Sequence, residues 1–351
     1  MKHILTFVFF LLGIISFSQN SQIEELWNLY NSRDFHNVIE KATPLLEHEP
    51  GNIDLNLMIG RSYTDLAAFE DAIPYLEFTV KNDLGNSWRK AWALSYLGPC
   101  YFVMEDYTGS EKSINDCIRL NATKNATNAA NGMAILFGFN QIYKEWKIAE
   151  TDHFRFHFQK MSDDDMENFA SSREDAFEKI NQFFNSDLPK KIDFFVWNSR
   201  EDAQKLMHAN LGFSKPELCV VHSHYQQTRG HEMTHVISNY TTQMINKTGL
   251  INEGTAVCFD LTNQNKEQIV KDWLKTNGEK VIIEEIWANW NAYPEELTYP
   301  LSGLFVKALI NNFGQEKFLE FFRNQTYDNG KLVFGDNLDL IIQDFENNIN
   351  L

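Results

Sequence analysis

The chain has 351 residues, of which 43% are hydrophobic and 14% are aromatic, so it can form one large domain or two ordinary domains. This composition argues against disorder over most of the length. The formal net charge of -17 at pH 7 argues against a nucleic-acid partner and against electrostatic attraction to an anionic membrane.

Residues 1–18 predict a secretory signal peptide. Lys2 supplies a positive n-region, residues 4–15 form a nearly unbroken apolar run, and Ser16 and Ser18 are small residues suited to cleavage before Gln19. An uncleaved anchor is the alternative, but the run is shorter than the roughly 20 apolar residues of a membrane span. We therefore expect an exported protein, periplasmic or extracellular, with no membrane span after cleavage.

Residues 19–148 predict a helical repeat domain. The segments that begin at Asp34, Ala68 and Asp106 align so that Phe35, Phe69 and Tyr107 coincide, at offsets of 34 and 38 residues. Small or apolar residues recur at two further aligned positions, namely Val38, Ala72 and Ser110, and then Ala42, Leu76 and Ile114. A glycine also precedes a tyrosine by three residues in two places, Gly60 with Tyr63 and Gly98 with Tyr101, where a small residue lets two helices approach closely.

This pattern resembles the tetratricopeptide repeat, with about three repeats. The first repeat is degenerate, and the third carries a four-residue insertion around residues 85–93. The resemblance implies a short curved solenoid that binds a partner protein or packs against the next domain. A generic array of helical hairpins is the alternative and would have similar mechanics.

The cysteines of the chain are Cys100, Cys117, Cys219 and Cys258, and none forms a C-x-x-C pair, which argues against a zinc–thiolate site. Export permits disulfides, and Cys100 and Cys117 fall in one predicted hairpin. They either form a disulfide or remain buried free thiols, and we favour the thiols.

The second domain is predicted over residues 149–351. A helix is expected to end within residues 140–148, and residues 153–158 then alternate as a strand with three phenylalanines on one face. Further strands are predicted over 191–197 and 217–225, and helices over 163–184 and 200–209. From Leu250 onward the pattern is almost wholly helical, so we expect an α+β domain with a small sheet and a helical lobe.

Two histidines in this half have the spacing of metal ligands. His231 and His235 are four residues apart, so they share one helical face and can bind one zinc ion. Glu232 lies beside the first histidine and can take a proton from a water that the metal activates. Because an H-E-x-x-H run arises by chance in roughly 2% of such chains, a second feature is needed.

That second feature is Glu253, which is separated from His235 by seventeen residues and directly precedes Gly254. A glutamate on a second helix can complete a site of two histidines and one carboxylate. Three protein ligands leave the fourth position open, which is typical of catalytic zinc and not of structural zinc.

These motifs resemble the gluzincin metallopeptidases, in particular the peptidase MA-like domain, over residues 151–322. The matching blocks are H-E-x-x-H, the N-E-G-x-A run of residues 252–256, and residues 299–318. The resemblance implies a zincin-like fold and one zinc ion per chain, held by His231, His235 and Glu253. It also implies peptide-bond hydrolysis with Glu232 as general base.

Two details of the resemblance bear on the reaction. Gluzincins need a donor to the developing oxyanion, and Tyr299 is our candidate, with a core tyrosine as the alternative. The aminopeptidase branch carries a Gly-x-Met-Glu-Asn motif that is missing before His231, so we expect an endopeptidase. A non-catalytic repeat protein with a relic peptidase domain and a zinc hydrolase of a non-peptide bond are the other hypotheses.

Three further residues have open interpretations. His222 and His224 share one face of a predicted strand. The alternatives are that they form a second metal pair, that they contact the substrate, or that they lie on a solvated face. That strand is expected at the sheet edge, where it would pair with an extended substrate. Asp260 lies two helical turns after Glu253 and either orients a ligand histidine or is a surface acid.

Overall fold

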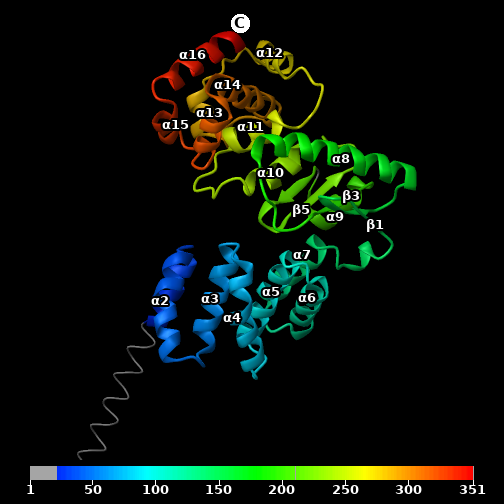
Figure 1. Cartoon of the computed structure of the whole chain (residues 1–351), viewed down its shortest axis with the longest axis vertical. Helices are drawn as coiled ribbons and strands as arrows, with labels where there is room; N and C mark the ends of the chain where they lie inside the picture. The colour runs from blue at the N-terminus through cyan, green and yellow to red at the C-terminus, as the bar shows by residue number, and fades with distance from the viewer. Residues whose placement is uncertain (1–21, 210, 351) are drawn as a thin grey trace, which may run out of the picture. The chain divides into compact units, whose positions relative to one another are not determined.

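The computed structural model describes residues 22–209 and 211–350, so the predicted signal peptide lies outside the described residues. The chain divides into two compact units between Lys144 and Glu145 (Figure 1). The expected boundary near Ala149 falls inside a strand of the second unit. Among the described residues, no helix has both the length and the apolar character that crossing a bilayer requires.

The first unit consists of consecutive helices that pack on their neighbours in sequence. The first helix covers residues 22–31. It is followed by α2 (Phe35–His48), α3 (Ile53–Asp65), α4 (Phe69–Asn82), α5 (Trp88–Val103), α6 (Tyr107–Leu120), α7 (Lys124–Leu136) and the short 3-10 helix η1 (Gln141–Tyr143). Helices α3, α5 and α7 also contact one another in succession, so equivalent helices form a row.

The aligned residues occupy equivalent places in this row. Helices α2, α4 and α6 begin at the three aligned aromatic residues. All six aligned small or apolar residues are fully buried. A Cβ atom added to Gly60 would lie 2.7 Å from Cγ of Leu76, and one added to Gly98 would lie 2.7 Å from Cγ1 of Ile114. The predicted close approach of helices at both glycines is therefore present.

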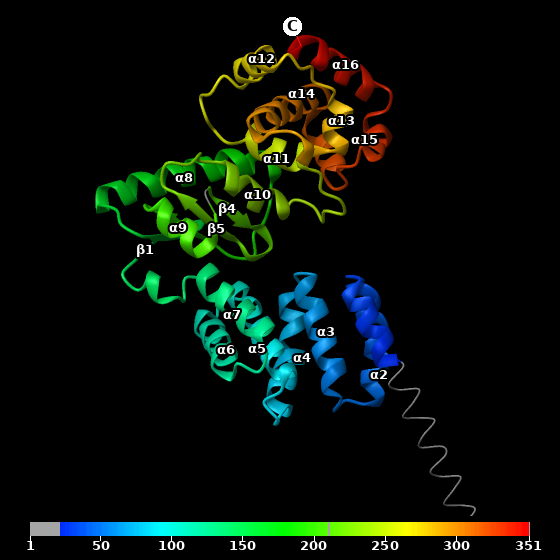
Figure 2. The same cartoon turned by 180° about the vertical axis from the view of Figure 1, so that it is seen from behind.

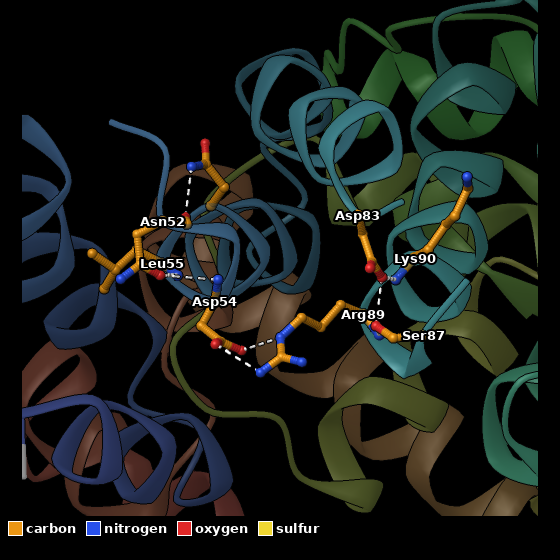
Figure 3. Close-up of polar contacts among 8 residues, drawn as sticks. Asn52, Asp54, Leu55, Asp83, Ser87, Arg89 and Lys90 are labelled. Atoms are coloured by element: carbon orange, nitrogen blue, oxygen red, sulfur yellow. Dashed lines mark hydrogen bonds and ion pairs between the residues drawn. The ribbon is translucent and has the colours of Figure 1, made fainter. Parts of the chain in front are cut away.

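Polar contacts anchor the insertion in the third repeat (Figure 3). Ser87 donates a hydrogen bond of 2.5 Å to Asp83. Ser87 is also the N-cap of α5, and its hydroxyl accepts a hydrogen bond from the backbone N–H of Arg89. The Arg89 guanidinium forms two bonds, of 2.6 and 2.8 Å, with the Asp54 carboxylate on α3. The insertion is thus held to the preceding repeat, although such a partly exposed pair contributes only about 0.2–1 kcal/mol.

All four cysteines are free thiols in the structure. Cys100 Sγ lies 3.3 Å from the Thr64 hydroxyl, and Cys117 donates a hydrogen bond of 3.1 Å to the Ala91 carbonyl. Burial raises the pKa of Cys117 to about 11. This arrangement agrees with the favoured interpretation of buried thiols.

The helix expected to end within residues 140–148 is a wrong prediction. Helix α7 ends at Leu136, and Gly138 follows with a positive φ of 77°, a conformation that terminates helices. The chain then forms η1 and the strand β1 (Lys147–Glu150), which pairs antiparallel with the next strand. A strand of four residues is too short to produce a recognisable alternation.

The second unit contains a five-stranded mixed sheet in the order β1-β2-β3-β5-β4. Its other strands are β2 (Phe154–Phe158), β3 (Ile192–Trp197), β4 (Phe213–Lys215) and β5 (Val220–His224). Its strands β4 and β5 are labelled in Figure 2. Strands β2, β3 and β5 are parallel, and both outer strands are antiparallel to their neighbours. The expectation that residues 217–225 form the sheet edge is therefore wrong, because the unpredicted three-residue strand β4 lies outside β5.

Helices cover the face of the sheet that carries the three alternating phenylalanines. Phe154, Phe156 and Phe158 are fully buried in a core shared with α8 (Asp163–Phe184) and α10 (His231–Asn239). Helix α8 begins after Ser162, whose hydroxyl accepts from the Asp165 N–H, and three aspartates in its first turn complement the helix dipole. Helix α9 (Arg200–Met207) and the short η2 (Pro216–Leu218) lie in the connections between strands.

The remaining helices form a lobe with its own apolar core. They are α11 (Gly249–Cys258), α12 (Lys266–Asn277), α13 (Ile283–Ala288), η3 (Trp290–Ala292), α14 (Glu295–Phe322), α15 (Tyr327–Phe334) and α16 (Asn337–Ile349). Helix α14 is two helices joined at Gly314, where φ is 81°. The molecule is thus mostly helical, with a helical first unit and an α+β second unit.

Candidate metal centre

Two helices bring the predicted ligands together. His231 and His235 stand on successive turns of α10, and Glu253 comes from α11, which packs against α10. The loop between these helices is tied to the segment after α14: the Ile245 N–H donates to the Arg323 carbonyl at 2.7 Å, and the Thr248 N–H donates to the Gln325 side chain at 2.9 Å. These bonds set the point at which α11 begins.

The distances between the ligand atoms suit a single metal ion. Oε2 of Glu253 lies 3.5 Å from Nε2 of His231 and 3.4 Å from Nε2 of His235. Ligand atoms held at about 2.0–2.1 Å by a tetrahedral zinc ion would lie roughly 3.3–3.4 Å apart. Among the described residues, these three form the only group of at least three histidine, cysteine or acidic side chains that could hold a metal.

The charges of His231 and Glu253 shift each other's pKa. Burial alone would lower the pKa of His231, but hydrogen bonding to Glu253 and the negative charges of Glu232 and Glu253 raise it. Burial alone would raise the pKa of Glu253, but the two histidines hold it well below its usual range. Glu253 is therefore ionised at neutral pH, as a metal ligand must be.

Glu232 lies beside the ligand group without belonging to it. Burial raises its pKa, an effect that the charges of His231 and His235 oppose and a hydrogen bond with Ser214 of β4 reduces further. A buried carboxyl group with a raised pKa next to a metal site is typical of a general base.

Tyr299, near the start of α14, faces the same site. Its ring stacks on His231 with 5.9 Å between ring centroids and contacts Trp290 at the same distance. Burial, together with the charges of Glu253, Glu295 and Glu232, raises the pKa of Tyr299 to about 12. Its hydroxyl therefore remains protonated at neutral pH and can donate a hydrogen bond.

Two cavities meet at the site, with volumes of about 550 and 360 Å³. Both are lined by His231, Glu232 and Tyr299. The larger cavity has apolar walls formed by Leu211, Val257, Ile269 and Pro300. The smaller cavity is more polar and contains the Glu253 carboxylate and Lys247. A substrate lying across the ligand group can therefore place one part in each cavity.

His222 and His224 lie outside the ligand group. His222 is only 2% exposed and stacks between Phe195 and Phe213, at centroid distances of 4.3 and 5.1 Å. Its Nδ1 lies 3.0 Å from the donor Nε1 of Trp197. The solvated-face interpretation is therefore wrong for His222, which is a buried member of a stack of rings that crosses the sheet.

Asp260 is neither a surface acid nor a hydrogen-bond partner of a ligand histidine. It is 6% exposed, and its Oδ1 accepts hydrogen bonds from Thr262 and from Lys266 at 3.0 Å. Its backbone carbonyl accepts from the Gly230 N–H at 3.2 Å, directly before His231. Asp260 thus stabilises the connection between α11 and α12 and contacts the start of α10 through the backbone.

Three residues of the site were not anticipated from the sequence. Ser214 approaches Glu232 from β4, and Lys247 lines the smaller cavity. Asn252 Nδ2 lies 3.4 Å from Nδ1 of His235 and 3.3 Å from Oε1 of Glu253. Only Asn252 had a signal in the sequence, because it immediately precedes the candidate ligand Glu253.

Comparison of the chain with models of known protein families gives no match. No curated protein matches it either.

Proposed function

We propose that this chain is an exported zinc-dependent metallopeptidase of the gluzincin type, acting as an endopeptidase. The observation that carries the proposal is the convergence of His231, His235 and Glu253 within 3.4–3.5 Å, with Glu232 beside them and outside the ligand set. A relic peptidase domain would be expected to have lost a metal ligand or the general base. This chain keeps all three proposed ligands and the proposed base.

The donor set favours zinc over harder cations. Two imidazole nitrogens and one carboxylate oxygen are the ligands of many catalytic zinc sites, whereas magnesium and calcium prefer oxygen ligands. When bound, a zinc ion supplies Lewis-acid chemistry by lowering the pKa of a water molecule and polarising a carbonyl group.

The residues around the ligands have separate tasks in this proposal. Glu232 accepts the proton of the attacking water and then delivers it to the leaving amine. The Tyr299 hydroxyl donates a hydrogen bond to the developing oxyanion. Its raised pKa permits this because the phenol stays protonated. Ser214 holds Glu232 through their hydrogen bond.

The position of β4 suits the binding of an extended peptide. This strand is the last in the sheet order, so its outer edge can pair with a substrate backbone. It also lines the smaller cavity through Phe213 and Ser214. A peptide paired with β4 would therefore run past Glu232 and the ligand group.

The first unit is a tetratricopeptide-like solenoid in this proposal, and it binds a partner protein or a large substrate. Its support is the row of equivalent helices with the aligned glycines at the points of closest approach.

The test combines metal analysis with peptide cleavage. The parent and Glu232→Gln should each bind about one zinc ion per chain, while His231→Ala and Glu253→Ala should lose most of it. Glu232→Gln should lose about 10²–10⁴-fold in the rate of cleaving an unstructured peptide, because an amide cannot accept the proton.

Glu296→Gln is the matched control, since Glu296 lines the larger cavity and is exposed. Cleavage by Glu232→Gln within about tenfold of the parent rate would show that Glu232 is not the base. Full zinc content in both ligand variants would show that the metal binds elsewhere.

A further inference from the structure

The smaller cavity contains a lysine that no part of the proposed reaction uses. Lys247 lines this cavity together with His235, Asn252 and Glu253. Among the described residues that line it, Lys247 is the only lysine or arginine. We propose that Lys247 binds a carboxylate of the peptide substrate, which would make the enzyme selective for peptides with an anionic group on this side of the scissile bond. The inference rests on the proposed peptidase function.

Lys247 has no partner for its charge within the described part of the chain. No hydrogen bond from its ammonium group and no carboxylate within 4 Å of it are found among residues 22–209 and 211–350. Burial lowers the pKa of Lys247, and the negative charge of Glu217, which forms no ion pair with it, opposes this effect. The side chain is still accessible to solvent and lines the cavity, so its ammonium group can bind a ligand there.

The backbone that carries Lys247 is well anchored. Asn246, directly before it, bridges to Asn324, and its side-chain amide donates to the Asn324 side chain at 3.1 Å. Thr248, directly after it, is hydrogen bonded to the side chain and to the backbone carbonyl of Gln325. A lysine on a fixed backbone with a free ammonium group is well suited to select a charged ligand.

The larger cavity provides a contrast. Its lysine, Lys266, lies 3.0 Å from Oδ1 of Asp260 and 3.2 Å from the Thr262 hydroxyl, and it is largely buried. That charge is already neutralised, and the surrounding walls are apolar. The two cavities therefore differ in chemistry: an apolar side chain fits the larger one, and a carboxylate finds a free cation only in the smaller one.

The acids of the smaller cavity do not compete for Lys247. The Glu253 carboxylate pairs with the two histidines, and the Glu232 carboxylate forms a hydrogen bond with Ser214. In a chain with a net charge of -17, an anionic peptide is disfavoured by the overall charge, so a dedicated cation is needed to accept one. The carboxylate can come from an acidic side chain or from the carboxyl terminus of the peptide.

The experiment measures peptide binding to the full-length Glu232→Gln protein loaded with zinc, so no cleavage is required. Four fluorescent peptides of one sequence are compared: free acid or amide at the carboxyl terminus, each with an internal glutamate or glutamine. We expect the preferred carboxylate to tighten binding by about tenfold, the lower end for a hydrogen bond to a charged group. The pair of peptides that shows the effect identifies the source of the carboxylate.

Substitution of Lys247 in the same background completes the test. Lys247→Ala should remove the preference for the carboxylate, and Lys247→Arg should retain most of it. Lys280→Ala, at an exposed lysine that lines neither cavity, should leave the preference intact. Equal binding of all four peptides, or a preference that survives Lys247→Ala, would overturn the inference.

These outcomes are separate from those that test the proposed function. A parent enzyme that cleaves all four peptides equally would remain a peptidase without the selectivity. A protein that binds carboxylate peptides through Lys247 but never cleaves them would retain the binding site and lose the peptidase assignment.

Discussion

Replacing Gly254 by alanine tests the packing that holds Glu253 in the candidate metal centre. Gly254 follows the candidate ligand Glu253 on α11, where this helix packs against α14. A Cβ atom at this position would lie 2.6 Å from the carbonyl oxygen of Ser302 and 2.9 Å from its carbonyl carbon. Because the obstacle is the backbone of a buried helix, it cannot rotate away as a flexible side chain could. Helix α11 must therefore move, and Glu253 moves with it.

The size of the effect follows from two opposing contributions. Overpacking a well-packed site costs about 1–3 kcal/mol. Alanine in a helix interior recovers about 0.8–1.0 kcal/mol relative to glycine. Since backbone atoms are involved, we expect a net loss of about 1–2 kcal/mol in the free energy of unfolding. For a unit the size of residues 145–351, this corresponds to a fall of roughly 2–8 °C in Tm.

The shift of α11 should also weaken metal binding. Metal sites tolerate ligand displacements of only about 0.2 Å, so we expect at least about a tenfold loss of zinc affinity. Thermal unfolding followed by circular dichroism and zinc competition with a chromophoric chelator measure the two effects.

Gly132→Ala is the matched control, because Gly132 is in helix α7 and a Cβ there would have no atom within 4 Å. That variant should gain about 0.5–1 kcal/mol and keep its zinc affinity. If Gly254→Ala matched the parent in both Tm and zinc affinity, the close crossing of α11 and α14 would not be what positions Glu253.

Three further predictions concern pH, catalysis and domain structure. Because the pKa of His231 is raised, a proton competes with the metal for this side chain below that pKa, and zinc affinity should fall about tenfold for each pH unit of acidification. Competition with a chelator between about pH 8 and about pH 5.5 measures this fall. A zinc affinity that does not change with pH would contradict the prediction. Tyr299→Phe should keep its zinc and lose about 10²–10³-fold in kcat, with an unchanged cleavage rate as the contrary result. A fragment beginning at Glu145 should have a higher Tm than one beginning at Thr151. Only the longer fragment keeps β1 and the edge-to-face contact of Trp146 with Trp197, whose ring centroids lie 4.9 Å apart. Equal Tm values for the two fragments would show that β1 does not contribute to stability.

The sequence by itself determined the elements whose signals are local. A helix was predicted near Asp163 to Phe184, which are the observed bounds of α8, and its signals are local, since a capping serine and three acidic residues stand at its start. The three phenylalanines of β2 were assigned to one face from their alternation alone, and that face is buried. The spacing of His231 and His235 placed both on one helical face, and the repeat alignment paired three aromatic residues that prove to lie at equivalent positions of α2, α4 and α6.

Only the tertiary structure decided which of these elements are neighbours. The short strands β1 and β4 each pair with the next strand along the chain, but four or three residues carry no periodic signal of their own. The position of β5 inside the sheet could not be predicted either. Alternation along a strand reveals its apolar face but not which strands lie beside it.

The environments of single side chains were decided in the same way. His222 became part of a ring stack because three strands place aromatic residues at matching registers. Asp260 and Lys266 neutralise each other across a turn, whereas Lys247 is left without a partner among the described residues and lines a cavity beside Glu253. A charge pattern along the chain cannot distinguish these two lysines, because pairing depends on which groups the fold brings within about 4 Å.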